Sequence, residues 1–126
     1  MSEFITLVEA LAIHTDQIDR YGGSYGIRDK GLLEAALFRP QTGYYNDLIQ
    51  KSAALWESLA QNHPFIDGNK RTAFAVTYTF LALNGVLISA DAEMAYSFIS
   101  ELYRNNNFEF EILDQWLRLN TVKHSA

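Results

Sequence analysis

One short stretch of this chain, HPFIDGNKR from His63 to Arg71, concentrates the residue types that bind phosphate groups and move protons. Its proline and its glycine predict a loop, so the next helix should begin near Asn69. The first N–H groups of a helix are unpaired and carry the positive end of the helix dipole, which suits an anion. Lys70 and Arg71 add two full positive charges at that point. The stretch therefore predicts a phosphate-binding site.

The same stretch offers an acid–base group and a metal ligand. His63 stands just before the loop, and its imidazole is a candidate general base toward a hydroxyl group. Asp67 supplies hard carboxylate oxygens, which suit a Mg²⁺ ion that bridges the phosphates of a nucleotide. An ordinary polar helix start would explain any one of these residues, but it does not require so many chemical types in one short stretch. We therefore interpret the stretch as a functional site.

The stretch resembles the motif of the Fic/Doc family, whose general form is His-x-Phe-x-Asp/Glu-Gly-Asn-Gly-Arg-x-x-Arg. Lys70 stands where the AMP-transferring Fic branch has its second glycine, and Phe74 stands where that branch has its second arginine. Both departures are typical of the death-on-curing (Doc) branch. The string from Arg20 to Gly23 and the string from Gly26 to Pro40 are also similar to Doc proteins, so the resemblance covers most of the chain.

The resemblance implies a role for each residue of the motif. The implied catalytic residues are His63, Asp67, Lys70 and Arg71, with Asp67 as the Mg²⁺ ligand, and the implied ATP-binding residues are Phe65, Gly68, Asn69, Lys70 and Arg71. A lysine in place of the second glycine fills space and offers a cation. In the Doc branch this goes with an inverted nucleotide, whose γ-phosphoryl group lies next to the histidine.

Membership of the Doc branch would imply the toxin of a type II toxin–antitoxin system. Such a protein acts as a Ser/Thr kinase-like phosphotransferase, moves the γ-phosphoryl group of ATP to a hydroxyl of elongation factor Tu, and blocks translation. Self-inhibited Fic proteins carry an inhibitory helix, and the nearest string here, from Ser97 to Leu102, fails at its final position. Control is therefore expected from a cognate antitoxin encoded by an adjacent gene, with a disordered segment that folds on binding.

Other functions remain open at this stage. The nearest is AMP transfer to a protein hydroxyl, the reaction of the Fic branch. A catalytically idle protein that only binds a nucleotide or another anion is a second. A metal-dependent hydrolase is the weakest alternative, because His63 and Asp67 alone do not make a ligand set of the usual size.

Composition limits the remaining possibilities. A chain of 126 residues with 48% hydrophobic residues predicts one domain, residues 1–126. The chain has no cysteine and no recognisable signal peptide, so a cytoplasmic location is expected. The uncharged run from Thr72 to Ala90 is broken at Asn84, well short of the about 20 residues that span a membrane. The net charge of −5 argues against direct binding of nucleic acid.

Apolar spacing and capping signals predict an all-α bundle of about six helices, as the Fic fold would imply. The expected helices are residues 3–21, 31–38, a helix capped by Asn46 or Asp47 that stops before Pro64, a helix from Asn69 to Leu83, a helix capped by Ser89 or Asp91, and residues 109–119. The segment from Thr72 to Leu83 is apolar almost all round, which is expected of a helix surrounded by others. His14, inside the first helix, is interpreted as structural.

Overall fold

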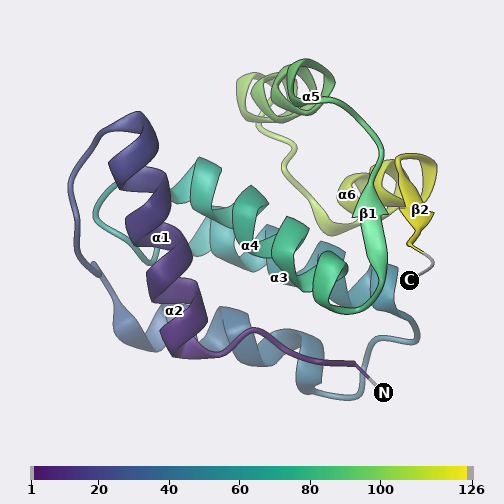
Figure 1. Ribbon diagram of the computed structural model, residues 1–126, viewed down its shortest axis with the longest axis horizontal. Helices are drawn as coiled ribbons and strands as arrows, with labels where there is room; N and C mark the ends of the chain where they lie inside the picture. Colours follow the sequence, from purple (N-terminus) through teal and green to yellow (C-terminus); the bar gives the residue numbers. More distant parts are fainter. Residues whose placement is uncertain (1, 125–126) are drawn as a thin grey trace.

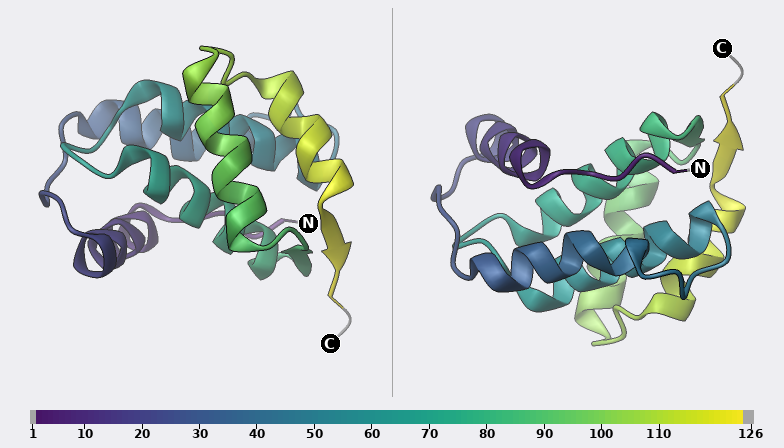
Figure 2. Two further views of the ribbon diagram at one scale, coloured as in Figure 1. Left: turned by 90° about the horizontal axis from the view of Figure 1, so that it is seen from above. Right: turned by 90° about the horizontal axis from the view of Figure 1, so that it is seen from below.

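The computed structural model describes residues 2–124 and confirms the all-α prediction, with six α-helices in that part of the chain (Figure 1). The elements are α1 (Leu7–Tyr21), α2 (Lys30–Phe38), a 3₁₀ turn η1 (Arg39–Gln41), α3 (Leu48–Asn62), α4 (Asn69–Leu83), strand β1 (Val86–Ile88), α5 (Ala92–Arg104), α6 (Phe110–Leu119) and strand β2 (Thr121–Lys123). Helices α3 and α4 lie side by side through the middle of the molecule, and α1 packs against α4 (Figures 1 and 2).

The first helix begins later than the apolar pattern predicts. Thr6 and Glu9 form a capping box, in which each side chain accepts a hydrogen bond from the other residue's backbone N–H. These bonds satisfy donors that have no partner inside the helix, so the helix starts at Leu7 and the preceding residues stay extended. Aspartates cap three of the later helices, Asp29 at α2, Asp47 at α3 and Asp91 at α5. Asp47 and Asp91 were each one of two residues expected at the cap.

The core is centred on α3. Trp56 is fully buried, and its ring packs against aromatic rings from α4, α5, α6 and the turn before α6: Phe74, Phe98, Trp116 and Phe108. Burying such a ring removes a large apolar area from water, worth about 2–3 kcal/mol by area. These contacts fix α3 and, with it, the loop at its C-terminal end that carries the motif.

The prediction that α4 is enclosed on all sides is wrong. Its inner side, with Val76 and Phe80, is buried, but Leu83 near the helix end is 44% exposed, and Tyr78, on the side that faces α5, is 43% exposed. Helix α5 crosses over the molecule (Figure 2) and lies apart from α4 (Figure 1). The cleft between them is lined in part by Phe74 and Tyr78. Apolar residues on this side of α4 therefore form a cleft wall. No helix within residues 2–124 has both the length and the apolar character needed to cross a membrane.

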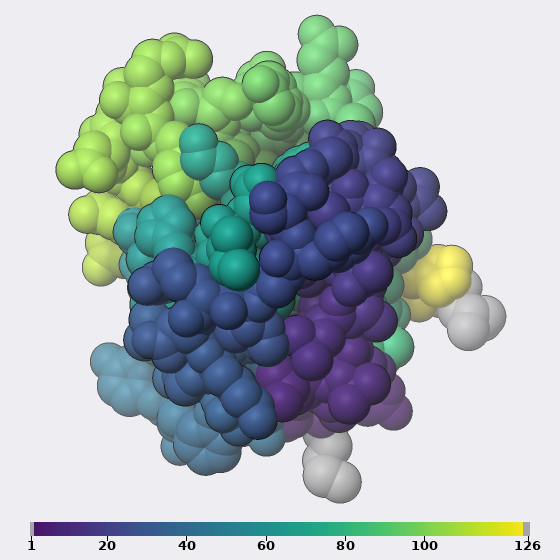
Figure 3. All heavy atoms as spheres, turned by 90° about the vertical axis from the view of Figure 1, so that its left-hand side faces the viewer, coloured from purple at the N-terminus to yellow at the C-terminus, as the bar shows by residue number. Residues whose placement is uncertain are grey.

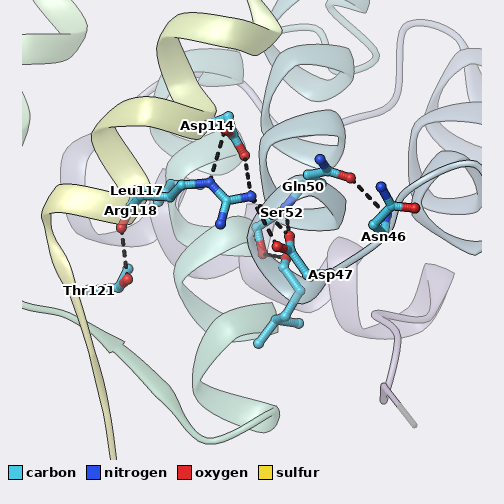
Figure 4. A network of polar contacts seen from close by, with 9 residues as sticks. Asn46, Asp47, Gln50, Ser52, Asp114, Leu117, Arg118 and Thr121 are labelled. Atoms are coloured by element: carbon cyan, nitrogen blue, oxygen red, sulfur yellow. Dashed lines mark hydrogen bonds and ion pairs between the residues drawn. The ribbon is translucent and has the colours of Figure 1, made fainter.

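Two long-range ties close the C-terminal part of the fold. Strands β1 and β2 pair in antiparallel register, with Leu87 opposite Val122. Strands of three residues carry too little alternation to be predicted from the sequence. In α6, the Arg118 guanidinium bonds Asp114 and also Asp47, the N-cap of α3, at 3.0 Å (Figure 4).

Candidate active site

His63 is held at the edge of the site through its backbone. It ends α3 in a left-handed conformation, with φ 47° and ψ 56°, which is uncommon for a residue other than glycine. The Arg28 guanidinium donates hydrogen bonds to the carbonyls of Asn62 (2.7 Å) and His63 (2.6 Å). The Pro64 carbonyl accepts two more, from the backbone N–H groups of Arg28 and Asp29. These bonds clamp the turn and leave the exposed imidazole of His63 unrestrained.

Asn69 shapes the motif loop from inside. Its side-chain oxygen accepts the Phe65 N–H at 3.0 Å, and its side-chain nitrogen donates to the Phe65 carbonyl at 2.9 Å. The Phe65 ring is 1% exposed and belongs to the hydrophobic core. The Asn69 amide thus bonds the backbone and the Phe65 ring is buried, so both side chains shape the loop; that these two residues bind nucleotide stays a prediction.

Asp67 presents an ionised carboxylate at the start of α4. Its two oxygens accept N–H groups from Ser24 at 3.0 Å and from Gly68 at 2.8 Å, and these bonds lower the pKa of the carboxyl, with a smaller contribution from the positive charge of Arg71. Gly23 permits the close approach of the chain to this carboxylate, since a Cβ there would lie 2.7 Å from Asp67 Oδ2.

The donor set fits Mg²⁺ in one of the ways that proteins commonly hold it. The ion usually keeps several waters and binds through one or two carboxylates and the phosphates of a substrate. Asp67 is exposed and ionised, and each oxygen has lone pairs beyond the one used by the loop. Among residues 2–124, no three His, Cys, Asp or Glu side chains gather as a metal site of their own. The Asp67 carboxylate would thus hold the ion jointly with phosphate.

The N-terminus of α4 is the candidate for the anion site that the motif predicts. Gly68 has φ 73°, and its carbonyl accepts the first helical hydrogen bond, from the Thr72 N–H at 2.9 Å. Within residues 2–124 no side chain caps this end, so helix geometry leaves the N–H groups of Asn69, Lys70 and Arg71 for a ligand.

The two cations of the motif lean toward opposite walls. Lys70 Nζ lies 4.2 Å from the centre of the Tyr103 ring in α5, a favourable cation–π contact. Burial raises the pKa of Tyr103 to about 12, so this ring stays neutral. Arg71 Nη2 donates to the Gly22 carbonyl at 2.9 Å, at the end of α1. Positive charge therefore flanks the helix N-terminus on both sides.

These groups meet at one end of a cleft of about 1500 Å³ between α1, α4 and α5. In Figure 3 the teal atoms of the motif region lie between the dark blue end of α1 and the yellow-green end of α5. The lining includes His63, Asp67, Gly68, Asn69, Lys70 and Arg71, which are all the predicted site residues except Phe65. An imidazole, an exposed carboxylate and an uncapped helix N-terminus thus face the same space, an arrangement suited to group transfer from a nucleotide.

His14 and Arg28 contact the motif although neither was predicted to do so. His14 is 3% exposed, its Nε2 lies 2.8 Å from the Asp67 carbonyl oxygen, and its ring stacks on Phe65 at 3.9 Å. Packing was expected for this histidine, but its contact with the loop was not. Its position within an apolar helix gives no local signal, because the partner lies 53 residues away in the sequence.

The lowered pKa of Asp67 gives a prediction for stability. A carboxyl with a lower pKa in the folded than in the unfolded state stabilises the fold above its unfolded pKa, and the benefit is lost as pH falls through the folded pKa. Without Mg²⁺, the wild type should therefore melt above Asp67→Asn at about pH 6, and the gap should shrink toward about pH 3. Calorimetry of both proteins in EDTA checks this; a gap that widens on acidification would contradict the lowered pKa.

Comparison with known proteins agrees with this geometry. The profile of the Fic/DOC family matches residues 4–81, more than half of the chain. Toxin Doc of Mycolicibacterium smegmatis is 49% identical over 79 residues, covering 59% of this chain and 61% of that protein, so the match spans less than two thirds of its length. Protein kinase doc of Escherichia phage P1 is 38% identical over 91 residues, covering 69% of this chain and 72% of that protein. The match of the family profile, joined to the helical fold and the placement of the motif, shows that this chain belongs to the Fic/DOC family.

Proposed function

We propose that this protein is the toxin of a toxin–antitoxin module and transfers the γ-phosphoryl group of ATP to a hydroxyl of a target protein, elongation factor Tu. The observation that carries the proposal is the anion site at the N-terminus of α4, flanked by Lys70 and Arg71 and facing the same cleft as His63. The names of the two relatives, a toxin and a protein kinase, support the same reaction and role. Blocked translation is the expected consequence.

The proposed reaction assigns a separate task to each group. His63 takes the proton of the target hydroxyl, a contribution of about 10²–10⁴-fold. The hydroxyl oxygen forms a bond to the γ-phosphorus while the bond to the β,γ-bridging oxygen breaks, and ADP leaves with that electron pair. Arg71 and the N–H groups after Gly68 bind the phosphate oxygens and stabilise the charge that they carry in the transition state. A bound Mg²⁺ at Asp67 would neutralise phosphate charge.

The labelled phosphorus atom distinguishes the proposal from its alternatives. Purified protein is incubated with elongation factor Tu and either γ-³²P-ATP or α-³²P-ATP, with a bacterial lysate as a second source of targets. Label on the target from γ-ATP alone is the expected result. Label from α-ATP alone would mean AMP transfer, and nucleotide binding with no label from either would mean an idle binding protein; both outcomes contradict the proposal.

Lys70 should determine which phosphorus reacts. Lys70→Gly removes a cation and opens space at the helix N-terminus, so transfer from γ-ATP is expected to fall about tenfold. Some AMP transfer should become measurable, without a full switch, because Phe74 still replaces the second arginine of the Fic motif. Lys70→Met, which keeps the bulk without the charge, should lose transfer without gaining AMP transfer. Unchanged γ-transfer in Lys70→Gly would show that other residues fix the orientation.

The proposed module requires an antitoxin, encoded beside this protein. The cleft between α1, α4 and α5 suits a partner segment, since its walls expose apolar rings such as Tyr78 and Tyr96 and the motif opens at one end. A segment that folds there would cover the anion site and stop transfer. Expression of this protein should arrest growth, and co-expression of the adjacent gene should restore it. Healthy growth with the active protein alone would refute the toxin role.

A further inference from the structure

We propose that His14 is a positioning residue of the active site, which holds the peptide between Asp67 and Gly68 in its working orientation. The inference rests on the proposed function, because it concerns the site that binds phosphate and Mg²⁺. His14 lies in α1, far from the motif in sequence, and reaches the loop through a hydrogen bond and a ring stack. It is 3% exposed and bound to backbone, so it acts through the loop and touches no substrate.

The direction of the hydrogen bond follows from its partner. The Asp67 carbonyl oxygen has no proton to give, so the His14 Nε2 at 2.8 Å must carry the hydrogen and donate it. The imidazole also lies parallel to the Phe65 ring, with 4° between the two planes and 3.9 Å between their centres. The loop is thus fixed to α1 at two points, a backbone carbonyl and a buried side chain.

The Asp67–Gly68 peptide needs such a restraint because a glycine follows it. Gly68 has φ 73°, and glycine adopts positive and negative φ at similar cost, so this peptide plane can rotate more easily than others. The carbonyl and the N–H of a trans peptide point in opposite directions. At present the carbonyl faces His14 and the Gly68 N–H bonds Asp67 Oδ1 at 2.8 Å.

A rotated peptide would damage the site in a definite way. Its carbonyl oxygen would replace the Gly68 N–H beside the Asp67 carboxylate, and two negative groups would repel each other. The carboxylate would turn away from its place at the helix N-terminus and take the Mg²⁺ site with it. With its hydrogen on Nε2, His14 opposes this rotation, because the rotated peptide would present an N–H group to the Nε2–H group unless the imidazole changed tautomer.

Four variants separate the hydrogen bond from the packing. His14→Phe keeps a ring on Phe65 and loses the donor. His14→Gln keeps a donor at a similar distance and loses the ring, while His14→Met has a similar length and no donor. Thr77→Val is the matched control, since it removes a buried hydrogen bond to the Ala73 carbonyl, elsewhere on α4. Melting temperatures show whether each variant is folded.

Two measurements are made on each protein. One is the rate of γ-phosphoryl transfer as a function of Mg²⁺ concentration, and the other is binding of Mg²⁺-pyrophosphate by calorimetry, which needs no turnover. The Mg²⁺ concentration for half-maximal rate and the dissociation constant for Mg²⁺-pyrophosphate should rise about tenfold in His14→Phe and His14→Met. In His14→Gln both should return to within about threefold of the wild type. The protein-target KM and the Thr77→Val values should stay near wild type.

The results test the positioning role of His14 and the proposed phosphoryl transfer separately. Equal losses in His14→Gln and His14→Met, or in Thr77→Val at matched stability, would overturn the positioning role. If His14→Phe does not fold, the comparison of Gln with Met still decides. A wild type that binds Mg²⁺-pyrophosphate and transfers nothing would refute the proposed function alone, and the binding series would still test His14. A wild type that does not bind would overturn both.

Discussion

His63→Ala should lower phosphoryl transfer by about 10²–10⁴-fold and leave the helical fold intact, since a positioned base contributes this much. The imidazole is exposed at the edge of the cleft, and the rest of the protein holds only the backbone of this residue. Loss of the side chain therefore removes no packing. The left-handed backbone, φ 47°, is the one structural cost, because alanine resists this conformation.

His63→Asn is the matched control for that cost. Asparagine tolerates the left-handed conformation better than alanine, yet its amide does not accept a proton at neutral pH. Both variants should show the same large loss of transfer from γ-³²P-ATP, and both should relieve growth arrest at equal protein level. His63→Asn should melt closer to the wild type. Transfer at the wild-type rate in His63→Asn would remove the general base from the mechanism.

The sequence predicted those parts of the fold that depend on neighbouring residues. Asp47 and Asp91, each one of two residues expected at a cap, do cap α3 and α5, because an N-cap bonds N–H groups two or three residues further along. The start of α4 at Asn69 was predicted from a different local signal, because a glycine and a proline mark the loop before it. The chemistry of the motif was readable because its residues are adjacent.

The rest depends on contacts between distant segments. His14 bonds the Asp67 carbonyl, which lies 53 residues further along the chain, so residue types near His14 do not reveal this contact. In the sequence, nothing distinguishes Arg28 from other charged residues. Its hydrogen bonds to the carbonyls of Asn62 and His63, at the end of α3, appear only in the folded structure. The prediction that other helices surround α4 was wrong, because apolar residues in a helix can line an open cleft as well as pack in a core. The sequence pattern does not distinguish these two cases. The sequence thus shows the reactive groups of the site, and the folded structure shows the contacts that hold these groups in place.

Removal of Arg71 should cause the second-largest loss of phosphoryl transfer, after that of His63. Its guanidinium donates to the Gly22 carbonyl at 2.9 Å and lies 5.6 Å from the Tyr21 ring centre, so the end of α1 holds this charge in place beside the anion site. A charge that is already oriented stabilises a transition state without reorganisation. Arg71→Ala should therefore lower kcat by about 10²–10³-fold, the typical cost of losing one oriented donor.

Arg71→Lys tests whether charge alone is enough. A guanidinium has five N–H donors and can bond the Gly22 carbonyl and a phosphate oxygen together, whereas a lysine ammonium is a point charge on a flexible stem. Arg71→Lys should thus recover less than about a tenth of the lost rate, although it restores the net charge. Steady-state rates at saturating ATP, with melting curves for both variants, provide the measurement. Full recovery of the rate in Arg71→Lys would show that the hydrogen bond to α1 is irrelevant to catalysis. If the loss of rate in Arg71→Ala is explained by unfolding of the variant, Arg71 has only a structural role.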